Sequence, residues 1–340
     1  MSYKQTYFLV TTWLYHVKID VRKLKKGRIL VMSARNLPKS QAIKKKLLHS
    51  WQLYILLLPG LIWLMLFMYA PMYGILIAFK NYKVKLGILG SPWCGFKYFE
   101  EFFTTSVSLS TIRNTVVLSL ESLVFSFPIP IIFALLLNQL RFEKYRKVVQ
   151  TVSYAPHFVS SVVVVSIMNV LTSTNGMING FVKMFGHEAI YFSTLPQYFR
   201  PLYIISGIWQ DMGFSAIIYI AALAGVSPDL HEAAIVDGAT KLQRLIHIDF
   251  PTILPTIVIM LILACGNIMS IGYEKVYLMQ NGMNTSVSEI ISTYVYKVGL
   301  LNAQYGFSTA VGLFNSLVNF VLIISVNAIA KRMSSISLFL

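Results

Sequence analysis

The sequence predicts an all-α membrane protein with six transmembrane helices. Of its 340 residues, 56% are apolar and only 12% are charged, and the mean hydropathy is +0.65. A soluble domain contains about 25% charged residues. Apolar runs of about 20 residues, the length that crosses a bilayer, recur six times. We expect spans near residues 53–79, 114–137, 152–171, 202–223, 252–270 and 309–330, within a transmembrane domain of residues 51–335.

Residues 1–50 are predicted to form a basic cytoplasmic extension. They hold twelve of the 29 Lys and Arg residues, directly before an apolar run. That arrangement favours contact with anionic lipid over nucleic acid. The apolar stretch 7–17 is too short to span a bilayer and lacks a small-residue cleavage site, so we expect no signal peptide. Met32 could equally be a translation start, which would make residues 1–31 an extension outside the fold.

The orientation of the six spans follows from the charges of the segments between them. The side that holds both termini carries twenty basic residues, and the opposite side carries nine. Since basic residues favour the cytoplasmic side, both termini and the loop at residues 224–250 are predicted to be cytoplasmic. Cys94 and Cys265 are the only cysteines, so no disulfide framework or thiolate metal site is indicated.

The loop at residues 227–251 is predicted to fold as a helix, a turn and a second helix. Ser227 can cap the first helix, and Pro228 suits its first position. Gly238 supplies the left-handed residue that ends it. Thr240 and Gln243 have the spacing of a capping box at the start of the second helix.

The second helix of this loop has an apolar face that needs a cover. We expect Pro251 to stop this helix at the membrane surface. Local features do not decide whether a protein groove or the lipid headgroups cover this face. The apolar face consists of Leu242, Leu245, Ile246 and Phe250.

The same loop resembles the signature of binding-protein-dependent ATP-binding cassette (ABC) importer permeases. That signature reads EAA, three residues, G, nine residues, I, one residue, L, P. All spacings match, and only the leucine is replaced, by a phenylalanine that keeps an apolar contact. The matching residues are Glu232, Ala233, Ala234, Gly238, Ile248, Phe250 and Pro251.

The resemblance implies a six-transmembrane-helix ABC importer permease fold with a cytoplasmic coupling-helix pair. It extends from Trp51 onwards and is similar to the carbohydrate branch, with LplB-like and YteP-like permeases for polysaccharides or oligosaccharides. Residues 207–213, 221–225 and 293–305 carry that likeness. In the family the coupling pair sits in a cleft of the ATPase. By resemblance, the docking residues are Glu232, Ala233, Ala234, Asp237 and Gly238.

The energy source must lie outside this chain, because the sequence has neither G-x-x-x-x-G-K-[ST] nor G-x-G-x-x-G. The resemblance therefore implies two ATPase copies that bind ATP and Mg, a second homologous permease and an extracytoplasmic solute-binding protein. The chain itself would be no enzyme and would hold no cofactor. It would lie in a bacterial inner membrane and move an oligosaccharide, such as one derived from a uronate polymer or another polysaccharide, by alternating access.

Polar residues within spans are the candidates for a substrate pathway, because they are costly in lipid unless they face a cavity or one another. Asp211 lies beside Trp209 and Gln210, a combination of aromatic, amide and carboxylate groups that suits a sugar. The alternative is that groups on neighbouring helices form hydrogen bonds with these polar side chains. By resemblance to the maltose permease, the pathway residues are Gln210, Asp211, Phe214, Asn267 and Ser270, followed by Tyr154, His157 and Trp209.

The sequence also bears on two other classes of function. A secondary transporter could carry protons on Glu121 and Asp211, but it would be expected to have related halves, and no convincing repeat is present. An intramembrane enzyme would need a motif such as H-E-x-x-H or G-x-S-x-G, and neither occurs. Isolated histidines at 187, 231 and 247 predict no metal site. Glu274 and Lys275 are expected to pair with each other or with loop residues.

Overall fold

The computed structural model describes residues 51–140 and 142–334. The predicted extension at residues 1–50 lies outside this range. The described residues form helices and no strand, apart from one isolated bridge between Lys80 and Trp93. Six helices are long and apolar enough to cross a membrane, as the fold-class prediction requires. They are Trp51–Phe79, Ser106–Asn138, Ser161–Met184, Pro196–Leu223, Lys241–Gly266 and Tyr305–Arg332.

The chain divides into two compact units, at residues 1–73 and 74–340. The described part of the first unit contains α4 (Trp51–Leu64) and the π turn η2 (Met65–Tyr69). The 3-10 helix η3 (Ala70–Phe79) begins there and continues into the second unit. The sequence of α4 is almost wholly apolar, which suits a helix in hydrocarbon.

The second unit holds the remaining helices. The segment after η3 contains η4 (Val84–Leu86), α5 (Gly87–Gly90) and α6 (Lys97–Thr104). The second, third and fourth spans with their connections comprise α7 (Ser106–Ser126), α8 (Pro128–Asn138), α9 (Glu143–Tyr154), η5 (Ala155–Phe158), α10 (Ser161–Thr172), α11 (Met177–Met184), α12 (Pro196–Ser215) and α13 (Ile217–Leu223).

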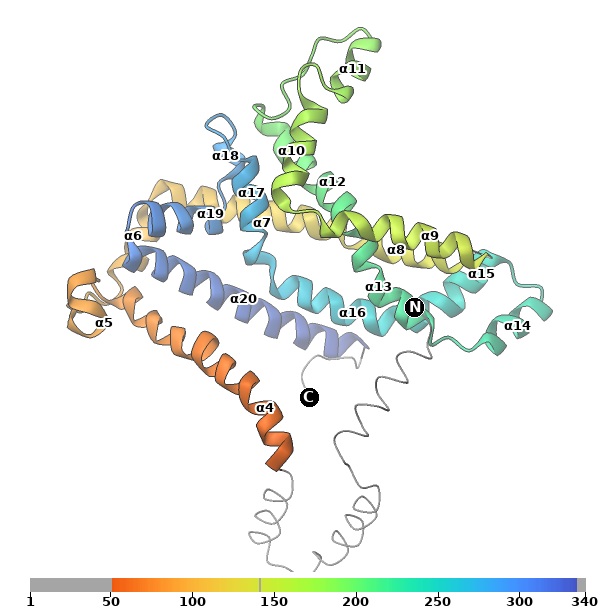
Figure 1. The fold of residues 1–340 in the computed structure, drawn as a ribbon, viewed down its shortest axis with the longest axis horizontal. Helices are drawn as coiled ribbons and strands as arrows, with labels where there is room; N and C mark the ends of the chain where they lie inside the picture. Colours follow the sequence, from red (N-terminus) through yellow and green to blue (C-terminus); the bar gives the residue numbers. More distant parts are fainter. Residues whose placement is uncertain (1–50, 141, 335–340) are drawn as a thin grey trace, which may run out of the picture. The chain divides into compact units, whose positions relative to one another are not determined.

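The rest of the unit comprises the loop between the fourth and fifth spans and the last two spans (Figure 1). The elements are α14 (Pro228–Val236), α15 (Lys241–Arg244), η6 (Leu245–Asp249), α16 (Phe250–Gly266), η7 (Ile268–Ser270), α17 (Tyr273–Met279), α18 (Thr285–Ser288), α19 (Ile291–Tyr296), η8 (Lys297–Leu301) and α20 (Tyr305–Ser334).

The third span begins later than hydropathy predicts. Val152 lies on α9, whose polar sequence is separated from α10 by the 3-10 turn around Pro156. A proline in such a turn removes a backbone donor and lets the chain change direction. The apolar run from residue 152 therefore covers two helices, and only α10 and α11 form the span.

Close packing joins the last two spans. Figure 1 shows α16 and α20 side by side. A Cβ atom built on Gly266 would come within 2.9 Å of the Ile323 side chain. The absence of a side chain at position 266 thus lets the two helices approach closely. Buried Met269 and Val311 continue this contact beyond the end of α16.

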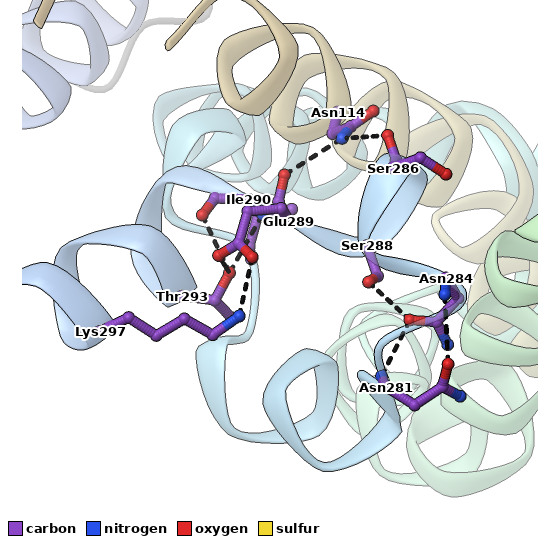
Figure 2. A network of polar contacts seen from close by, with 9 residues as sticks. All are labelled: Asn114, Asn281, Asn284, Ser286, Ser288, Glu289, Ile290, Thr293 and Lys297. Atoms are coloured by element: carbon purple, nitrogen blue, oxygen red, sulfur yellow. Dashed lines mark hydrogen bonds and ion pairs between the residues drawn. The ribbon is translucent and has the colours of Figure 1, made fainter. Parts of the chain in front are cut away.

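The connection between the fifth and sixth spans is fixed to α7 by polar contacts (Figure 2). The Asn114 amide donates to the backbone carbonyls of Ser286 and Glu289, at 2.9 and 3.2 Å. Lys297 and Glu289 form an ion pair of 2.7 Å. Thr293 donates to the same carboxylate at 3.1 Å. These bonds hold the connection as a defined structure although it lacks a long helix.

Candidate functional site

The loop at residues 227–251 folds as a capped helix, a turn and a second helix, as predicted. The Ser227 hydroxyl accepts from the backbone N–H of Asp229 at 3.3 Å, at the start of α14. Gly238 has a φ of +75°, the left-handed conformation that favours glycine. Thr240 and Gln243 form the capping box, with backbone-to-side-chain bonds of 2.8 and 3.3 Å.

Pro251 does not stop the second helix, and this part of the prediction is wrong. The helix runs without interruption from Lys241 to Gly266. The π turn η6 lies ahead of the proline, with the Phe250 N–H donating to the Leu245 carbonyl. Pro251 therefore lies at the junction between this π turn and α16. The N–H that a proline lacks thus falls where the helical hydrogen-bond pattern already changes. The second helix of the loop and the fifth span are thus one continuous helix.

The predicted docking residues lie on an accessible surface. Glu232, Ala233, Asp237 and Gly238 are exposed and Ala234 is half-buried. No hydrogen bond or ion pair joins the side chains of the two acids to another residue in the described part of the chain. The same helix exposes large apolar side chains that a partner could cover, and these are Leu230, Ile235 and Val236.

Two adjoining cavities lie between α7, α8, α12 and the broken end of the fifth span. Their volumes are about 450 and 390 Å³. Both are bordered by Ser122, Ser126 and Ser215, so hydroxyl groups occur along the shared wall. The Ser122 hydroxyl is buried and has no hydrogen-bond partner in the described residues. Hydroxyl-lined, partly apolar cavities of this size suit sugar units.

The fifth span is broken where it borders the cavities. α16 ends at Gly266, and the chain continues through η7 and an extended Ile271 before α17. Side chains bond to the freed backbone groups: Ser119 donates to the Ile268 carbonyl, and the Asn319 carbonyl oxygen accepts from the Met269 N–H at 3.0 Å. Irregular backbone at membrane depth is tolerated where it is satisfied by protein or lines a cavity.

Three of the predicted pathway residues form one cluster. Nδ1 of His157 lies 2.9 Å from Oδ1 of Asp211. The His157 ring stacks on Phe214 with centroids 3.8 Å apart and an angle of 4° between the rings. Gln210 donates to the Val159 carbonyl at 2.9 Å, which satisfies the backbone just after the break at Pro156. Thus α12 and the turn between α9 and α10 are joined at this cluster.

The predicted pathway residues differ in whether they line a cavity. Gln210 and Asp211 line the smaller cavity, and Asn267 lines the larger one. The other five line neither cavity, and two of these, His157 and Phe214, belong to the cluster. Trp209 is 49% exposed, Tyr154 is half-buried at the end of α9, and the Ser270 hydroxyl accepts from the Asn319 amide at 2.7 Å.

Lys275 is the functional candidate that the sequence did not single out. It lines the smaller cavity, it is only 9% exposed, and its ammonium lies 5.1 Å from the centre of the Tyr203 ring. Burial lowers the pKa of Lys275 to about 8, and the nearby Asp211 carboxylate opposes that change. The predicted pair with Glu274 is not formed, because Glu274 accepts from Ser161 at 3.1 Å.

The acidic groups near Lys275 already have partners. Asp211 contacts His157, and Glu274 contacts Ser161. Among the described residues, no carboxylate oxygen lies within ion-pair distance of the Lys275 ammonium. A cation this deeply buried is costly unless an anion compensates it. The cavity is therefore suited to receive a carboxylate.

Glu121, the other acid proposed for proton transfer, has a different environment. It forms an ion pair with Arg200 of α12 at 3.4 Å. The pair links α7 to α12 away from the His157 cluster. Among the described residues, no group of three or more His, Cys, Asp or Glu side chains could hold a metal ion.

Comparison with known proteins places these features in one family. Residues 126–335 match the family model described as "Binding-protein-dependent transport system inner membrane component". The chain is 46% identical over 84% of its length to the polygalacturonan/rhamnogalacturonan transport system permease protein YteP of Bacillus subtilis, of which the match covers 90%. It is 45% identical to LplB of the same organism, over 84% of this chain and 91% of that one.

A solved structure shows the same fold. The structure of a bacterial ABC transporter involved in the import of the acidic polysaccharide alginate matches with a TM-score of 0.80 and 38% identity. The match covers 86% of this chain and 99% of that chain. A second structure has the same scores and contains the alginate transporter in complex with an alginate pentasaccharide-bound periplasmic protein.

Proposed function

Because this chain belongs to the binding-protein-dependent transport system inner membrane components, we propose that it carries an acidic oligosaccharide into the cell by alternating access. It is the membrane-spanning permease subunit of a sugar ABC importer. The proposal adds the acidic character of the cargo, the route through the two adjoining cavities and the docking of α14 on an ATPase.

Lys275 is the single observation that carries the choice of an acidic cargo. The ammonium of a buried lysine, beside hydroxyl groups and an aromatic ring, can bind a sugar carboxylate and the sugar ring together. The names of the relatives are consistent with such a cargo, since one concerns polygalacturonan and another the acidic polysaccharide alginate. A neutral sugar would leave the ammonium uncompensated.

The proposed partners follow from what the chain lacks and exposes. A solute-binding protein delivers the sugar, as in the related complex with a periplasmic protein. Two ATPase copies supply the energy and bind ATP and Mg, because no nucleotide motif is present here. A second homologous permease completes the pathway. The complex lies in the bacterial cell membrane with both termini of this chain in the cytoplasm.

ATPase closure moves the exposed docking surface of α14 in this proposal. Because the second helix of the loop continues into α16, movement that passes from α14 through the turn at Gly238 reaches the fifth span. The break after Gly266 lets α17, which holds Lys275, reorient against α12. The cavity then opens alternately to the two sides of the membrane.

The secondary-transporter alternative is not favoured. The relatives described above belong to binding-protein-dependent systems. Glu121 pairs with Arg200, and Asp211 contacts His157. The geometry thus gives both acids local partners within the bundle.

The experiment for the docking surface compares three forms of the complete importer. The Glu232→Lys substitution reverses the charge of an exposed side chain that pairs with no other described residue. In Gly238→Pro, the proline cannot adopt the left-handed φ of this position. We expect both variants to reach the membrane but to lose ATPase co-purification and uptake. Glu188→Lys makes the same charge change at another exposed acid and serves as the control. Wild-type uptake by Glu232→Lys would refute docking through α14.

A further inference from the structure

Asp249 is a fully buried carboxylate between the cytoplasmic loop and the membrane helices. Its exposure is 0%. Oδ2 accepts from the side-chain amide of Gln139 at 2.9 Å, and Oδ1 accepts from the amide of Asn138 at 3.4 Å. Nε2 of His231 lies 3.2 Å from Oδ1. This distance between the His231 ring and the Asp249 carboxylate is that of an ion pair when the ring carries a proton.

These contacts come from three separate elements. His231 lies on α14, directly before the predicted docking residue Glu232. Asn138 and Gln139 stand at the end of α8, which is the cytoplasmic end of the second span. Asp249 is the last residue of the π turn η6 and directly precedes α16. One side chain therefore joins the docking helix to the second and fifth spans.

The contact is mechanically stiff for two reasons. A buried carboxylate keeps its charge only while donors surround it, so loss of any one bond is costly. Leu245, on the same π turn, packs against the core formed by α8, α13 and α16, which includes Leu135 and Ile253. A shift of α14 must then move η6 and α8 together or break hydrogen bonds to a buried charge.

We propose that Asp249 is a positioning residue that passes the movement of α14 to the second and fifth spans through His231, Asn138 and Gln139. The second span lines both cavities through Ser122 and Ser126, and the fifth leads to the break before Lys275. Asp249 thus connects ATPase closure to both walls of the pathway. The inference rests on the proposed docking role of α14.

The test separates coupling from assembly by measuring oligosaccharide uptake per ATP hydrolysed in the complete, reconstituted importer. His231→Phe removes the polar contact with Asp249 and keeps an aromatic ring at this position. We expect normal ATPase co-purification, continued ATP hydrolysis and a fall in the ratio of about tenfold, the effect of losing one polar contact to a buried charged group. His231→Gln keeps an N–H donor and should restore the ratio.

His247→Phe is the matched control, since His247 is exposed on η6 and contacts only the Gln243 carbonyl within the described structure. Asp249→Ala should lower the ratio at least as far as His231→Phe. If the Asp249→Ala importer does not assemble, the test of the inference rests on the two His231 variants. A wild-type ratio for His231→Phe would overturn the inference. Failure of His231→Gln to restore the ratio, or loss of ATPase binding in His231→Phe, would do the same.

Failure of the docking proposal gives a different result. If Glu232→Lys keeps the ATPase bound and coupled, α14 is not the docking helix and the proposed function fails at that point. If Glu232→Lys releases the ATPase while His231→Phe stays fully coupled, docking stands and only the role of Asp249 is refuted.

Discussion

At the scale of single residues, the proposed acidic cargo makes Lys275 the residue that would set the charge preference of the pathway. Replacement by methionine keeps most of the apolar stem but removes the ammonium. We expect Lys275→Met to lower uptake of an acidic oligosaccharide by about tenfold or more, because one charge-assisted contact is lost. Uptake of a charge-reduced (esterified) oligosaccharide should fall much less. Lys183→Met on α11, outside both cavities, is the control, and equal losses for both substrates would contradict the assignment.

The charge of Lys275 should also make uptake depend on pH. Its pKa is lowered to about 8, so the ammonium is present below that pH and is lost as the pH rises through it. Uptake of an acidic oligosaccharide should therefore decline across this range. Lys275→Arg keeps its charge at every accessible pH and should flatten the profile. An unchanged decline in the arginine variant would show that another group titrates.

Single residues were predicted unevenly from the sequence. The caps at Ser227, Gly238 and Thr240 follow from local rules and are confirmed, because short-range geometry decides them. Glu274 and Lys275 are expected to pair with each other or with loop residues, and the first of these alternatives is wrong. Neighbours in a helix point about 100° apart, so they cannot face each other. Lys275 instead meets α12, a long-range contact that spacing does not reveal.

At the scale of elements, Gly213 allows α12 to pack against α9. A Cβ atom there would lie 2.2 Å from the Ser153 carbonyl oxygen. Gly213→Ala should therefore destabilise the purified protein by about 1–3 kcal/mol, the usual cost of overpacking. It should also lower uptake, because Asp211 and Phe214 would be displaced from His157. Thermal unfolding in detergent measures the first effect.

Gly180→Ala provides the matched control for this substitution. Gly180 is also helical, on α11, but a Cβ atom there meets nothing within 4 Å. Alanine should leave stability unchanged or raise it by up to about 1 kcal/mol, because it favours the helix. Equal melting temperatures for the wild type and Gly213→Ala would contradict the packing argument.

The loop contains elements that local sequence rules predict and one that they do not. Local signals predict α14 and its turn, but a proline predicts an end at Pro251 that does not occur. The π turn η6 shifts the backbone so that the proline fits the first turn of α16. Such a turn depends on packing of Leu245 and burial of Asp249, and neither is visible from residue spacing.

At the scale of the whole molecule, composition predicted the fold class because lipid imposes a simple rule. Every backbone group in a span must be satisfied internally, so long apolar runs become helices. The same rule cannot locate the break after Gly266, since side chains from other spans satisfy its backbone groups, whereas the break around Pro156 is indicated by the proline itself. The cavities lie beside the breaks, and therefore only part of the substrate pathway could be foreseen.

Energy coupling is the central claim for the whole molecule, and ATP-dependent uptake tests it most directly. Proteoliposomes containing the complete importer are given the sugar-loaded binding protein outside and ATP inside. We predict uptake that requires hydrolysable ATP and is unchanged when an uncoupler collapses the proton gradient. Uptake that continues without ATP and stops with the uncoupler would contradict the account.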